Sequence, residues 1–398
     1  MINMNKFTYI SLNELAKKYG NSFYLYYPES VKNNYRKIIN AFSSFYDRVI
    51  IAYAYKTNYL PHLCKTINEL GGMSEISSDI EYEISRNVGV CGDKIIFNGP
   101  CITEQLALNI LKRGGLINID SIEELKMIGS IAENHRITAR IGIRCFIQTS
   151  KKRASKFGIT PYSSDMDEML AYISAGPYFK LEAIHCHVKG RSLKDWEIRI
   201  SEMIKIERHI FSKYHIFIKY INLGGGIPSI PDMSMKEYAE IVGNKLKKEY
   251  VNSPDRPFLI LEPGTGISAD SMDFVSKVLN IKTCREQNIA FLDGSYWQIN
   301  PMKRNYTIPM QVISNGGGQY YQEIDFSGIT CLEDDYFYTG YSGNVQSGDF
   351  VLFHSVGAYS IVLKPPFITE NVSVIKWPEQ QVVKRKEYIS DILTTFYF

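Results

Sequence analysis

Short apolar runs alternate with amphipathic segments along the first two thirds of the chain. Eight runs rich in β-branched and aromatic residues have the length and composition of buried strands. These runs are RVIIAYA (48–54), GMSEIS (72–77), DKIIFN (93–98), GLINID (115–120), ITARIGIRC (137–145), LEAIHCHV (181–188), FIKYINL (217–223) and PFLILEP (257–263). Helical segments separate them, such as 121–133, where Ser121 and Glu124 form a capping box. Eight strand and helix units predict a closed (β/α)8 TIM barrel, whose usual size is about 250 residues.

The pattern changes after about residue 285. Helical periodicity nearly vanishes, and turn signals such as Asp293-Gly294 and Asn315-Gly316 become dense, which favours an all-β region. The opening residues contain the strand-like NSFYLYYP, which either joins that region or caps the barrel. We therefore predict an α/β plus β protein, with a barrel over 26–285 and a β-sandwich or β-barrel domain formed by 1–25 and 286–398.

Composition and charge narrow the class of protein. The 398 residues are 45% hydrophobic, enough for sizeable cores, and 45 basic against 42 acidic residues leave a net charge of +3. This balance lacks the basic excess of a nucleic-acid or anionic-membrane surface. No apolar stretch has the length of a membrane helix, and the start lacks a signal-peptide pattern. We expect a cytoplasmic protein with a small-molecule or protein partner, no nucleic acid and no membrane.

The seven cysteines are odd in number, scattered and never spaced as CxxC. This spacing argues against a disulfide framework and against a structural zinc site. We expect them to be reduced, although one of them can still take part in chemistry.

Unusual residues stand at the ends of four predicted strands, where barrel enzymes place their chemistry. They are Lys56 in AYAYKTN, His187 in HCHV, the triplet Gly224, Gly225 and Gly226 in NLGGGIP, and Glu262 in LEPG. We expect them to converge on one rim of the barrel.

Each of these features also has a plainer interpretation. Lys56 is either a surface lysine or a partly desolvated amine of lowered pKa that can form a Schiff base. The three glycines make either a tight turn or a phosphate cradle. Glu262 at a buried strand end needs a structural cation or a protonated heterocyclic nitrogen. His185 and His187 point the same way from a strand, but no second ligand motif accompanies them, so we predict no metal.

The ordered set of motifs resembles the pyridoxal-phosphate decarboxylases of the alanine-racemase-like fold, in particular the diaminopimelate and ornithine decarboxylase branch. The resemblance runs through nearly the whole chain and rests on AYAYKTN, SEISSDIEYEIS, NGP, NIDSIEEL, SKFGI, HCHV, NLGGGIP, LEPG, GITCLEDD and GAYS. The final VVKRKEYISDILTTFYF also resembles the family's terminal segment, so we expect the fold to be complete.

The resemblance implies pyridoxal 5'-phosphate as the cofactor and assigns its contacts. Lys56 matches the lysine that holds the cofactor through a Schiff base, and His187 matches the histidine that stacks on its ring. The glycines Gly224 to Gly226 match the phosphate-binding turn, with Tyr359 of GAYS reaching the same phosphate. Glu262 matches the carboxylate beside the ring nitrogen, and Gly264 follows it in LEPG.

The resemblance also implies residues that meet the substrate. Cys331 matches a cysteine that a partner subunit contributes and that helps to protonate the product carbon, so a homodimer is expected. Asp334 matches the acid of a C-x-x-D pattern, Glu333 is a candidate for contact with a distal amine, and Tyr359 lies near the same place. The predicted catalytic residues are Lys56, His187, Glu262 and Cys331.

Several positions depart from the family. Thr265 replaces the arginine of EPGR, Asn300-Pro301 replaces an Arg-Pro pair, and HVKG replaces HIGS, so that Lys189 or Arg191 is left to compensate at the phosphate. Leu332 replaces the acid that often follows the cysteine. Because Thr and Asn do not replace bidentate arginines, we expect a substrate other than free diaminopimelate, ornithine or lysine.

The working hypothesis is decarboxylation of a modified or conjugated amino acid. Examples are an aminocarboxypropyl group on a siderophore precursor or on a peptide-nucleotide antibiotic of the microcin C kind. The alternatives are a diaminopimelate, ornithine or lysine decarboxylase, an amino-acid racemase on the same fold, and a catalytically silent homologue that binds a partner enzyme. Retention of Lys56, Glu262 and Cys331 together argues against the silent homologue.

Overall fold

A computed structural model describes residues 7–149, 155–227, 235–251 and 253–397. Contacts divide the chain into two compact units, Val31–Ile267 and the combination of Met1–Ser30 with Ser268–Phe398. The boundaries differ from the predicted 26–285. The physical reason is that the long strand β10 (Met272–Cys284) pairs with strands of the second unit, although its apolar residues resemble those of a further barrel strand.

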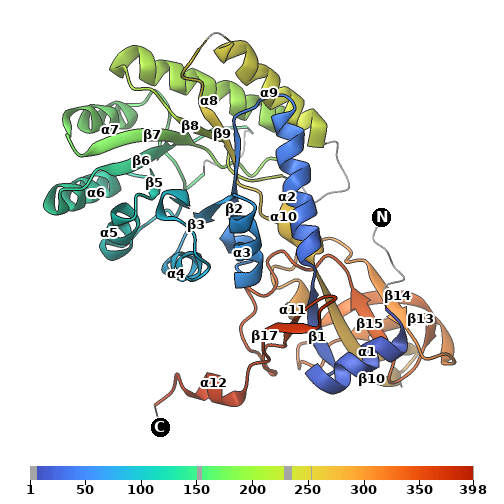
Figure 1. Cartoon of the computed structure of the whole chain (residues 1–398). Helices are drawn as coiled ribbons and strands as arrows, with labels where there is room; N and C mark the ends of the chain where they lie inside the picture. Colours follow the sequence, from blue (N-terminus) through green and yellow to red (C-terminus); the bar gives the residue numbers. More distant parts are fainter. Residues whose placement is uncertain (1–6, 150–154, 228–234, 252, 398) are drawn as a thin grey trace. The chain divides into compact units, whose positions relative to one another are not determined.

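The first unit is the predicted closed barrel of eight parallel strands, β2 to β9 in chain order. Pairing of β2 with β9 closes the ring (Figure 1). The strands are β2 Val49–Ala54, β3 Met73–Ile76, β4 Ile95–Phe97, β5 Leu116–Ile119, β6 Ala139–Arg144, β7 Phe179–His185, β8 Tyr220–Asn222 and β9 Phe258–Leu261. A cluster that includes Ala52, Ile96 and Ile260 packs within it. The predicted barrel is therefore confirmed, with each strand slightly shorter than its apolar run.

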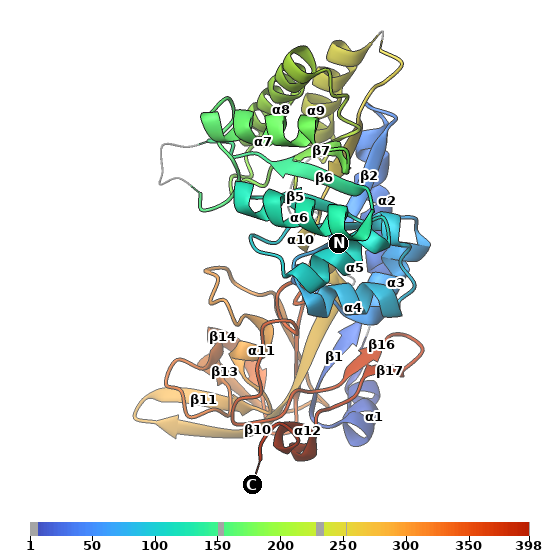
Figure 2. The same cartoon turned by 90° about the vertical axis from the view of Figure 1, so that its left-hand side faces the viewer.

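Helices lie on the outside of the barrel strands, as Figures 1 and 2 show. Their starts follow the capping chemistry of the sequence, because Ser121 accepts a hydrogen bond from the Glu124 backbone and Ser192 caps the helix that follows it. The helices are α2 Pro28–Ser43, α3 Pro61–Glu69, α4 Asp79–Asn87, α5 Glu104–Lys112, α6 Ile122–His135, α7 Ser164–Ala175, α8 Leu193–Tyr214, α9 Met235–Tyr250 and α10 Thr265–Ser268, with short 3-10 turns η1 Tyr55–Thr57 and η2 Gly92–Lys94. A third 3-10 turn, η3 Ala269–Ser271, belongs to the second unit.

The second unit is a mixed β-sheet domain, as the turn-rich half of the sequence predicts. Its sheet follows the order β14-β13-β11-β10-β1-β16-β17, and β15 pairs with both β10 and β12. The elements are α1 Tyr9–Tyr19, β1 Ser22–Tyr26, β10 Met272–Cys284, β11 Gln287–Leu292, α11 Tyr296–Ile299, β12 Met310–Ile313, β13 Gln319–Ser327, β14 Tyr336–Val345, β15 Phe350–Phe353, β16 Val374–Lys376, β17 Gln381–Lys384 and α12 Ile389–Leu393.

The N-terminal segment is part of this second unit. Strand β1 pairs antiparallel with β10 and parallel with β16, and helix α1 packs Leu12 and Leu15 into a core with Phe350 and Ile375. The strand NSFYLYYP is therefore a sheet strand and not a barrel cap. No helix in the described part of the chain is both long and apolar enough to cross a membrane.

Candidate functional site

The four sequence-predicted features of the barrel come from one sector of it. Lys56 follows β2, His187 follows β7, Gly224 follows β8 and Glu262 follows β9. These strands are consecutive around the closed ring, in the order β7-β8-β9-β2. His187 lies two residues beyond the end of β7, whereas the apolar run had placed it within the strand. The barrel topology therefore places these four features at the carboxyl ends of neighbouring strands, as expected.

Lys56 pairs with a carboxylate of the neighbouring strand. Its Nζ donates a hydrogen bond to Glu75 Oε1 at 2.6 Å and also contacts Glu75 Oε2. The Glu75 side chain is fully buried on β3, and that of Lys56 is 35% exposed. Burial opposes the charge of Lys56, but Glu75 and Glu262 outweigh it and hold its pKa above the usual value. Of the two interpretations of Lys56, the one with a lowered pKa does not match this direction, because a carboxylate on the next strand stabilises the charged amine.

Glu262 is a buried carboxylate with one oxygen in use and one spare. Oε1 accepts hydrogen bonds from Asn98 Nδ2 at 2.6 Å and from Asn222 Nδ2 at 2.7 Å. Oε2 has no hydrogen bond among the described residues, and the nearest histidine atoms are His185 Nε2 at 3.5 Å and His187 Nδ1 at 3.8 Å. Burial raises the pKa of Glu262, but the two histidines and Lys56 outweigh it and hold that pKa well below its usual value. An ionised oxygen is thus available to a protonated ring nitrogen.

An asparagine network that the sequence interpretation missed holds this carboxylate. Asn118 Nδ2 donates to Asn98 Oδ1 at 2.5 Å, and Asn222 Oδ1 accepts from the backbone N–H of Gly224 at 2.9 Å. All three asparagines are buried. A signal for them was present in the sequence, since each ends or interrupts an apolar strand run, in IIFN, LINID and YINL. Buried amides need partners, and here those partners orient Glu262.

The glycine turn leaves no room for side chains. Gly224 and Gly226 have φ values of 68° and 94°, in the left-handed region. A Cβ on Gly224 would collide with the Cys186 carbonyl, and one on Gly225 would lie 2.9 Å from the Glu262 carbonyl. The Gly225 N–H donates to His187 Nδ1 at 3.3 Å. The three glycines therefore form a tight turn that lies close to His187 and Glu262. Pro228, the last residue of the NLGGGIP motif, lies outside the described residues.

Gly264 brings a second turn close to Lys56. A Cβ at Gly264 would collide with the Thr57 hydroxyl, which directly follows Lys56 in η1. The backbone of the turn after Glu262 therefore packs against the Thr57 side chain of the turn that carries Lys56. Thr265, which stands where the family has an arginine, is half-buried at the start of α10.

The same cluster satisfies a simple distance criterion for a metal. Ligand atoms of His185, His187 and Glu262 all lie within 4.8 Å of one another. Against that use, His187 Nδ1 already accepts the hydrogen bond from Gly225. The fixed Lys56 and the glycine turn are better explained by an organic cofactor with an aldehyde, a ring nitrogen and a phosphate.

In the β-sheet domain, Cys331 lies in the loop between β13 and β14 and is exposed. The acid that organises this loop is Asp335, which is 1% exposed. Its carboxylate accepts from Ser295 Oγ at 3.0 Å, from the Tyr296 N–H at 2.8 Å and from Thr330 Oγ1 at 2.5 Å. The neighbouring Asp334, which is the acid of the C-x-x-D pattern, is exposed. With two adjacent aspartates, the sequence could not indicate which one turns inward.

The other two predicted substrate residues of this loop are also at the surface. Glu333 and Leu332 are exposed, and Asp334 forms an ion pair with Lys303, which lowers the pKa of Asp334 through the side-chain hydrogen bond. Lys189 and Arg191, the suggested phosphate partners, are exposed as well.

Tyr359 has a guanidinium neighbour within the β-sheet domain. Its backbone has φ 59°, and the guanidinium carbon of Arg304 lies 4.4 Å from its ring centroid. Asn300, which replaces the family arginine, is buried and bonds to Tyr296 and to the Arg304 backbone. Asn300 is therefore structural. Within the β-sheet domain, the arginine beside Tyr359 is Arg304, which the sequence interpretation did not single out.

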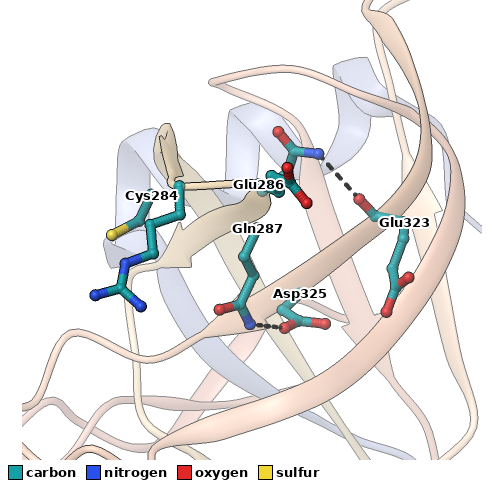
Figure 3. A pocket seen from close by; sticks show the side chains of 7 residues that line it. Cys284, Glu286, Gln287, Glu323 and Asp325 are labelled. Carbon is teal, nitrogen blue, oxygen red and sulfur yellow. Dashed lines mark hydrogen bonds between the residues drawn. The ribbon is translucent and has the colours of Figure 1, made fainter.

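A separate cavity of about 400 Å³ lies on the β10–β11 hairpin and β13 (Figure 3). Gln287 Nε2 donates to Asp325 Oδ2 at 2.5 Å, and Asn288 donates to the Glu323 carbonyl at 3.2 Å. The other residues that line it are Cys284, Arg285 and Glu286. None of the predicted site residues lines this cavity, and its amide groups already bond to the neighbouring strand.

Comparison with known proteins identifies the reaction of the barrel site that contains Lys56, His187 and Glu262. A family model described as the pyridoxal-binding domain of pyridoxal-dependent decarboxylases matches residues 30–269. The chain belongs to this family. It is a pyridoxal-phosphate-dependent amino-acid decarboxylase of the alanine-racemase-like fold. The spare Glu262 oxygen and the glycine turn, where a Cβ would collide, fit the ring nitrogen and phosphate of this cofactor.

Individual relatives extend the match over most of the chain. Diaminopimelate decarboxylase of Methanocaldococcus jannaschii is 28% identical over 372 residues, which cover 87% of this chain and 84% of the relative. L-glutamyl-[BtrI acyl-carrier protein] decarboxylase of Niallia circulans is 26% identical over 96% of this chain and 95% of its own length. A crystal structure of the M. jannaschii enzyme matches with a TM-score of 0.85 and 25% identity, over 97% of this chain and 94% of that one.

Proposed function

We propose that this decarboxylase removes the α-carboxylate of a modified or conjugated amino acid, with Lys56, His187, Glu262 and Cys331 as its catalytic residues. The observation that carries the reaction type is the buried, ionised Glu262 with its unused Oε2. Pyridoxal phosphate supplies the electron sink that accepts the electrons left when carbon dioxide departs. A carboxylate beside the ring nitrogen keeps that nitrogen protonated, which favours loss of carbon dioxide over racemisation.

In this proposal the barrel residues hold the cofactor and manage protons. Lys56 would hold the cofactor covalently, Glu262 Oε2 would accept a hydrogen bond from its ring nitrogen, and His187 would pack against its ring. Glu75 is within hydrogen-bond distance of Lys56 Nζ, so it is placed to take a proton from that amine and to return it. The glycines Gly224 to Gly226 and Gly264 line the phosphate end.

The β-sheet domain supplies the substrate side of the proposal. Cys331 donates a proton to the product carbon, and Glu333, Asp334 and Tyr359 contact the substrate. All but Tyr359 are exposed. Such exposure is expected of residues that reach into the active site of a second subunit. We further propose a homodimer, in which these residues come from the partner subunit.

Exposed apolar side chains support the homodimer. In the last 31 residues Ile368, Ile389, Phe396 and Tyr397 are each 59% exposed or more. Burial of these exposed side chains against a second subunit would remove their apolar surface from water.

Mixing of inactive variants tests the shared site. Lys56→Ala and Cys331→Ala are each expected to be inactive or nearly so, and co-refolding them should restore about a quarter of wild-type activity, since half of the dimers are mixed and each has one intact site. Cys331→Ala should also retain cofactor affinity. If mixing restores no activity while each variant folds and dimerises, then the site is not shared.

The substrate proposal rests on the departures and on one relative. Asn300 is engaged in the protein interior, Thr265 carries no charge, and Leu332 presents an apolar side chain where an acid is usual. The relative from Niallia circulans is named for action on a glutamyl group attached to a carrier protein, which is a conjugated amino acid. Free diaminopimelate is the second candidate, favoured by the M. jannaschii relative and by Arg304, whose guanidinium matches a carboxylate.

Carbon dioxide release across a substrate panel separates the candidates. The panel contains diaminopimelate, ornithine, lysine, carrier-bound glutamate and an aminocarboxypropyl-modified nucleotide peptide. We expect the highest kcat/KM for a conjugate. A clear preference for diaminopimelate would overturn the proposal, and Arg304→Met should then raise KM for diaminopimelate but not for lysine. Loss of optical activity without carbon dioxide release would instead indicate a racemase.

A further inference from the structure

Arg199 is a buried charge that forms no ion pair among the described residues, and the carboxylate of Asp195 on the same helix acts on it only electrostatically. Arg199 lies on α8 and has 0% exposure, with its guanidinium 4.9 Å from the Trp196 ring centroid. Among the described residues no carboxylate lies within ion-pair distance of it, and its Nε makes no hydrogen bond. A buried charge is costly unless another group compensates it. The motifs of the sequence did not point to this residue.

The guanidinium joins the two loops at the phosphate end of the site. Nη1 donates to the carbonyls of Leu223 at 3.3 Å and Gly225 at 2.7 Å, in the glycine turn. Nη2 donates to the Val188 carbonyl at 2.9 Å and to the Gly190 carbonyl, in the HVKG loop. The planar fork of an arginine suits this role, since it offers several donors in one plane.

These hydrogen bonds orient the opposite side of each peptide. In a trans peptide the C=O and the following N–H point in opposite directions. The carbonyls of Val188, Gly190 and Gly225 point at Arg199, so the N–H groups of Lys189, Arg191 and Gly226 point away from it. In the described part of the chain these three N–H groups have no hydrogen-bond acceptor. By contrast, the N–H groups of the preceding glycines bond to Asn222 and His187. Free backbone N–H groups on two adjoining loops are typical of an anion site.

The charge of Arg199 suits the same ligand. Burial lowers the pKa of Arg199, which means that its surroundings disfavour the positive charge. A guanidinium nevertheless stays protonated in proteins. A phosphate bound by the free N–H groups of the two loops would compensate the positive charge of Arg199. Thr265 offers no charge, and Lys189 and Arg191 are exposed.

We infer that Arg199 is the positioning residue of the cofactor phosphate. Its guanidinium binds the carbonyls of the HVKG loop and of the glycine turn, on the side of these loops away from the phosphate. Its positive charge takes the place of the arginine that Thr265 replaces. This inference rests on the proposed assignment of the glycine turn to the phosphate, and it is independent of the identity of the substrate.

The test compares binding of pyridoxal phosphate with binding of pyridoxal, which has the same ring and aldehyde but no phosphate. Titration followed by absorbance gives both dissociation constants without a turnover assay. Arg199→Met is expected to weaken pyridoxal phosphate binding by about 10- to 100-fold and pyridoxal binding by less than about threefold. Arg199→Lys keeps the charge but not the fork, and should give an intermediate loss for pyridoxal phosphate alone. Lys205→Met changes an exposed lysine of the same helix, and is the matched control that should bind both compounds like the wild type. Lys189→Met and Arg191→Met test the surface loop directly.

Each other outcome has a definite meaning. Equal loss of both compounds in Arg199→Met and Arg199→Lys would make Arg199 a general structural residue, and the inference would be wrong. Loss of pyridoxal phosphate affinity in Lys189→Met or Arg191→Met, with Arg199 variants unaffected, would assign the charge to the surface loop. If Arg199→Met does not fold, Arg199→Lys decides by the same criterion. A wild type that binds pyridoxal as tightly as pyridoxal phosphate would refute the phosphate site itself.

Discussion

The barrel half and the β-sheet half of the predicted site differ in burial and in hydrogen bonding. Glu75 and Glu262 in the barrel are completely or almost completely buried, and their neighbours shift the pKa of Lys56 upward and that of Glu262 downward. Cys331 and Glu333 in the β-sheet domain are exposed. The surroundings of the buried barrel carboxylates are therefore set by the barrel itself. The surroundings of Cys331 and Glu333 depend on the molecule that binds there.

The difference follows from the architecture. Ends of parallel strands in a closed barrel force side chains together, so their electrostatics are set by neighbours on adjacent strands. A loop between antiparallel strands has no such constraint and is held here by one buried acid, Asp335. We expect the barrel residues to control the reaction type and the loop residues to control the substrate. The following predictions, in order of decreasing effect, test that division.

The largest effect is expected for Lys56→Ala. Without the amine the protein cannot hold the cofactor covalently, so activity should fall by about 10³-fold or more and the visible absorption of bound cofactor should vanish. Lys65→Ala, which changes an exposed lysine on α3, is the control and should retain both. A Lys56→Ala protein with full colour would mean that another lysine makes the link.

Glu262→Gln should have the next largest effect. The amide keeps the size of the side chain but removes the negative charge beside the ring nitrogen, so kcat should fall by about 10²-fold while the cofactor remains bound. Steady-state kinetics together with cofactor titration separate these two effects. An unchanged kcat would show that Glu262 has no part in the reaction.

In the β-sheet domain we expect a contrast in stability between adjacent aspartates. Asp335→Ala leaves the buried donor of Ser295 and the partly buried donors of Tyr296 and Thr330 without an acceptor, and should lower the free energy of unfolding by about 2 to 4 kcal/mol. Asp334→Ala changes an exposed ion pair and should have no measurable effect on stability. Urea unfolding of both variants checks this, and equal effects would contradict the assignment of Asp335 as the anchor.

The smallest effect concerns pH and a barrel residue outside the site. Burial raises the pKa of Glu124 to about 7, so the folded protein keeps this proton up to a higher pH than the unfolded chain does. The free energy of unfolding should therefore fall as pH rises from about 4.5 to 7. Glu124→Gln should reduce that fall by about 1 to 3 kcal/mol. Glu123→Gln, at an exposed neighbour, is the control, and identical pH profiles for the two variants would contradict the prediction.

Much of the fold and part of the site could be predicted from local patterns. Apolar runs, caps and turn dipeptides are local signals, and they located the eight strands of the barrel and the β-rich half. Lys56, Glu262 and the glycine turn were found because motif spacing and strand ends coincide. The domain boundary at residue 267 was missed, since β10 resembles a barrel strand in composition and only its partners distinguish it.

Residues that act through distant partners required the tertiary structure. The pKa of Lys56 depends on Glu75, which comes from another strand, and the choice of Asp335 over Asp334 depends on donors some 40 residues earlier in the chain. Arg199 is one basic residue among many in a helix until its four carbonyl partners are in place. Sequence periodicity records which face of an element is apolar. Charge compensation depends on distances between elements, which only the folded chain sets.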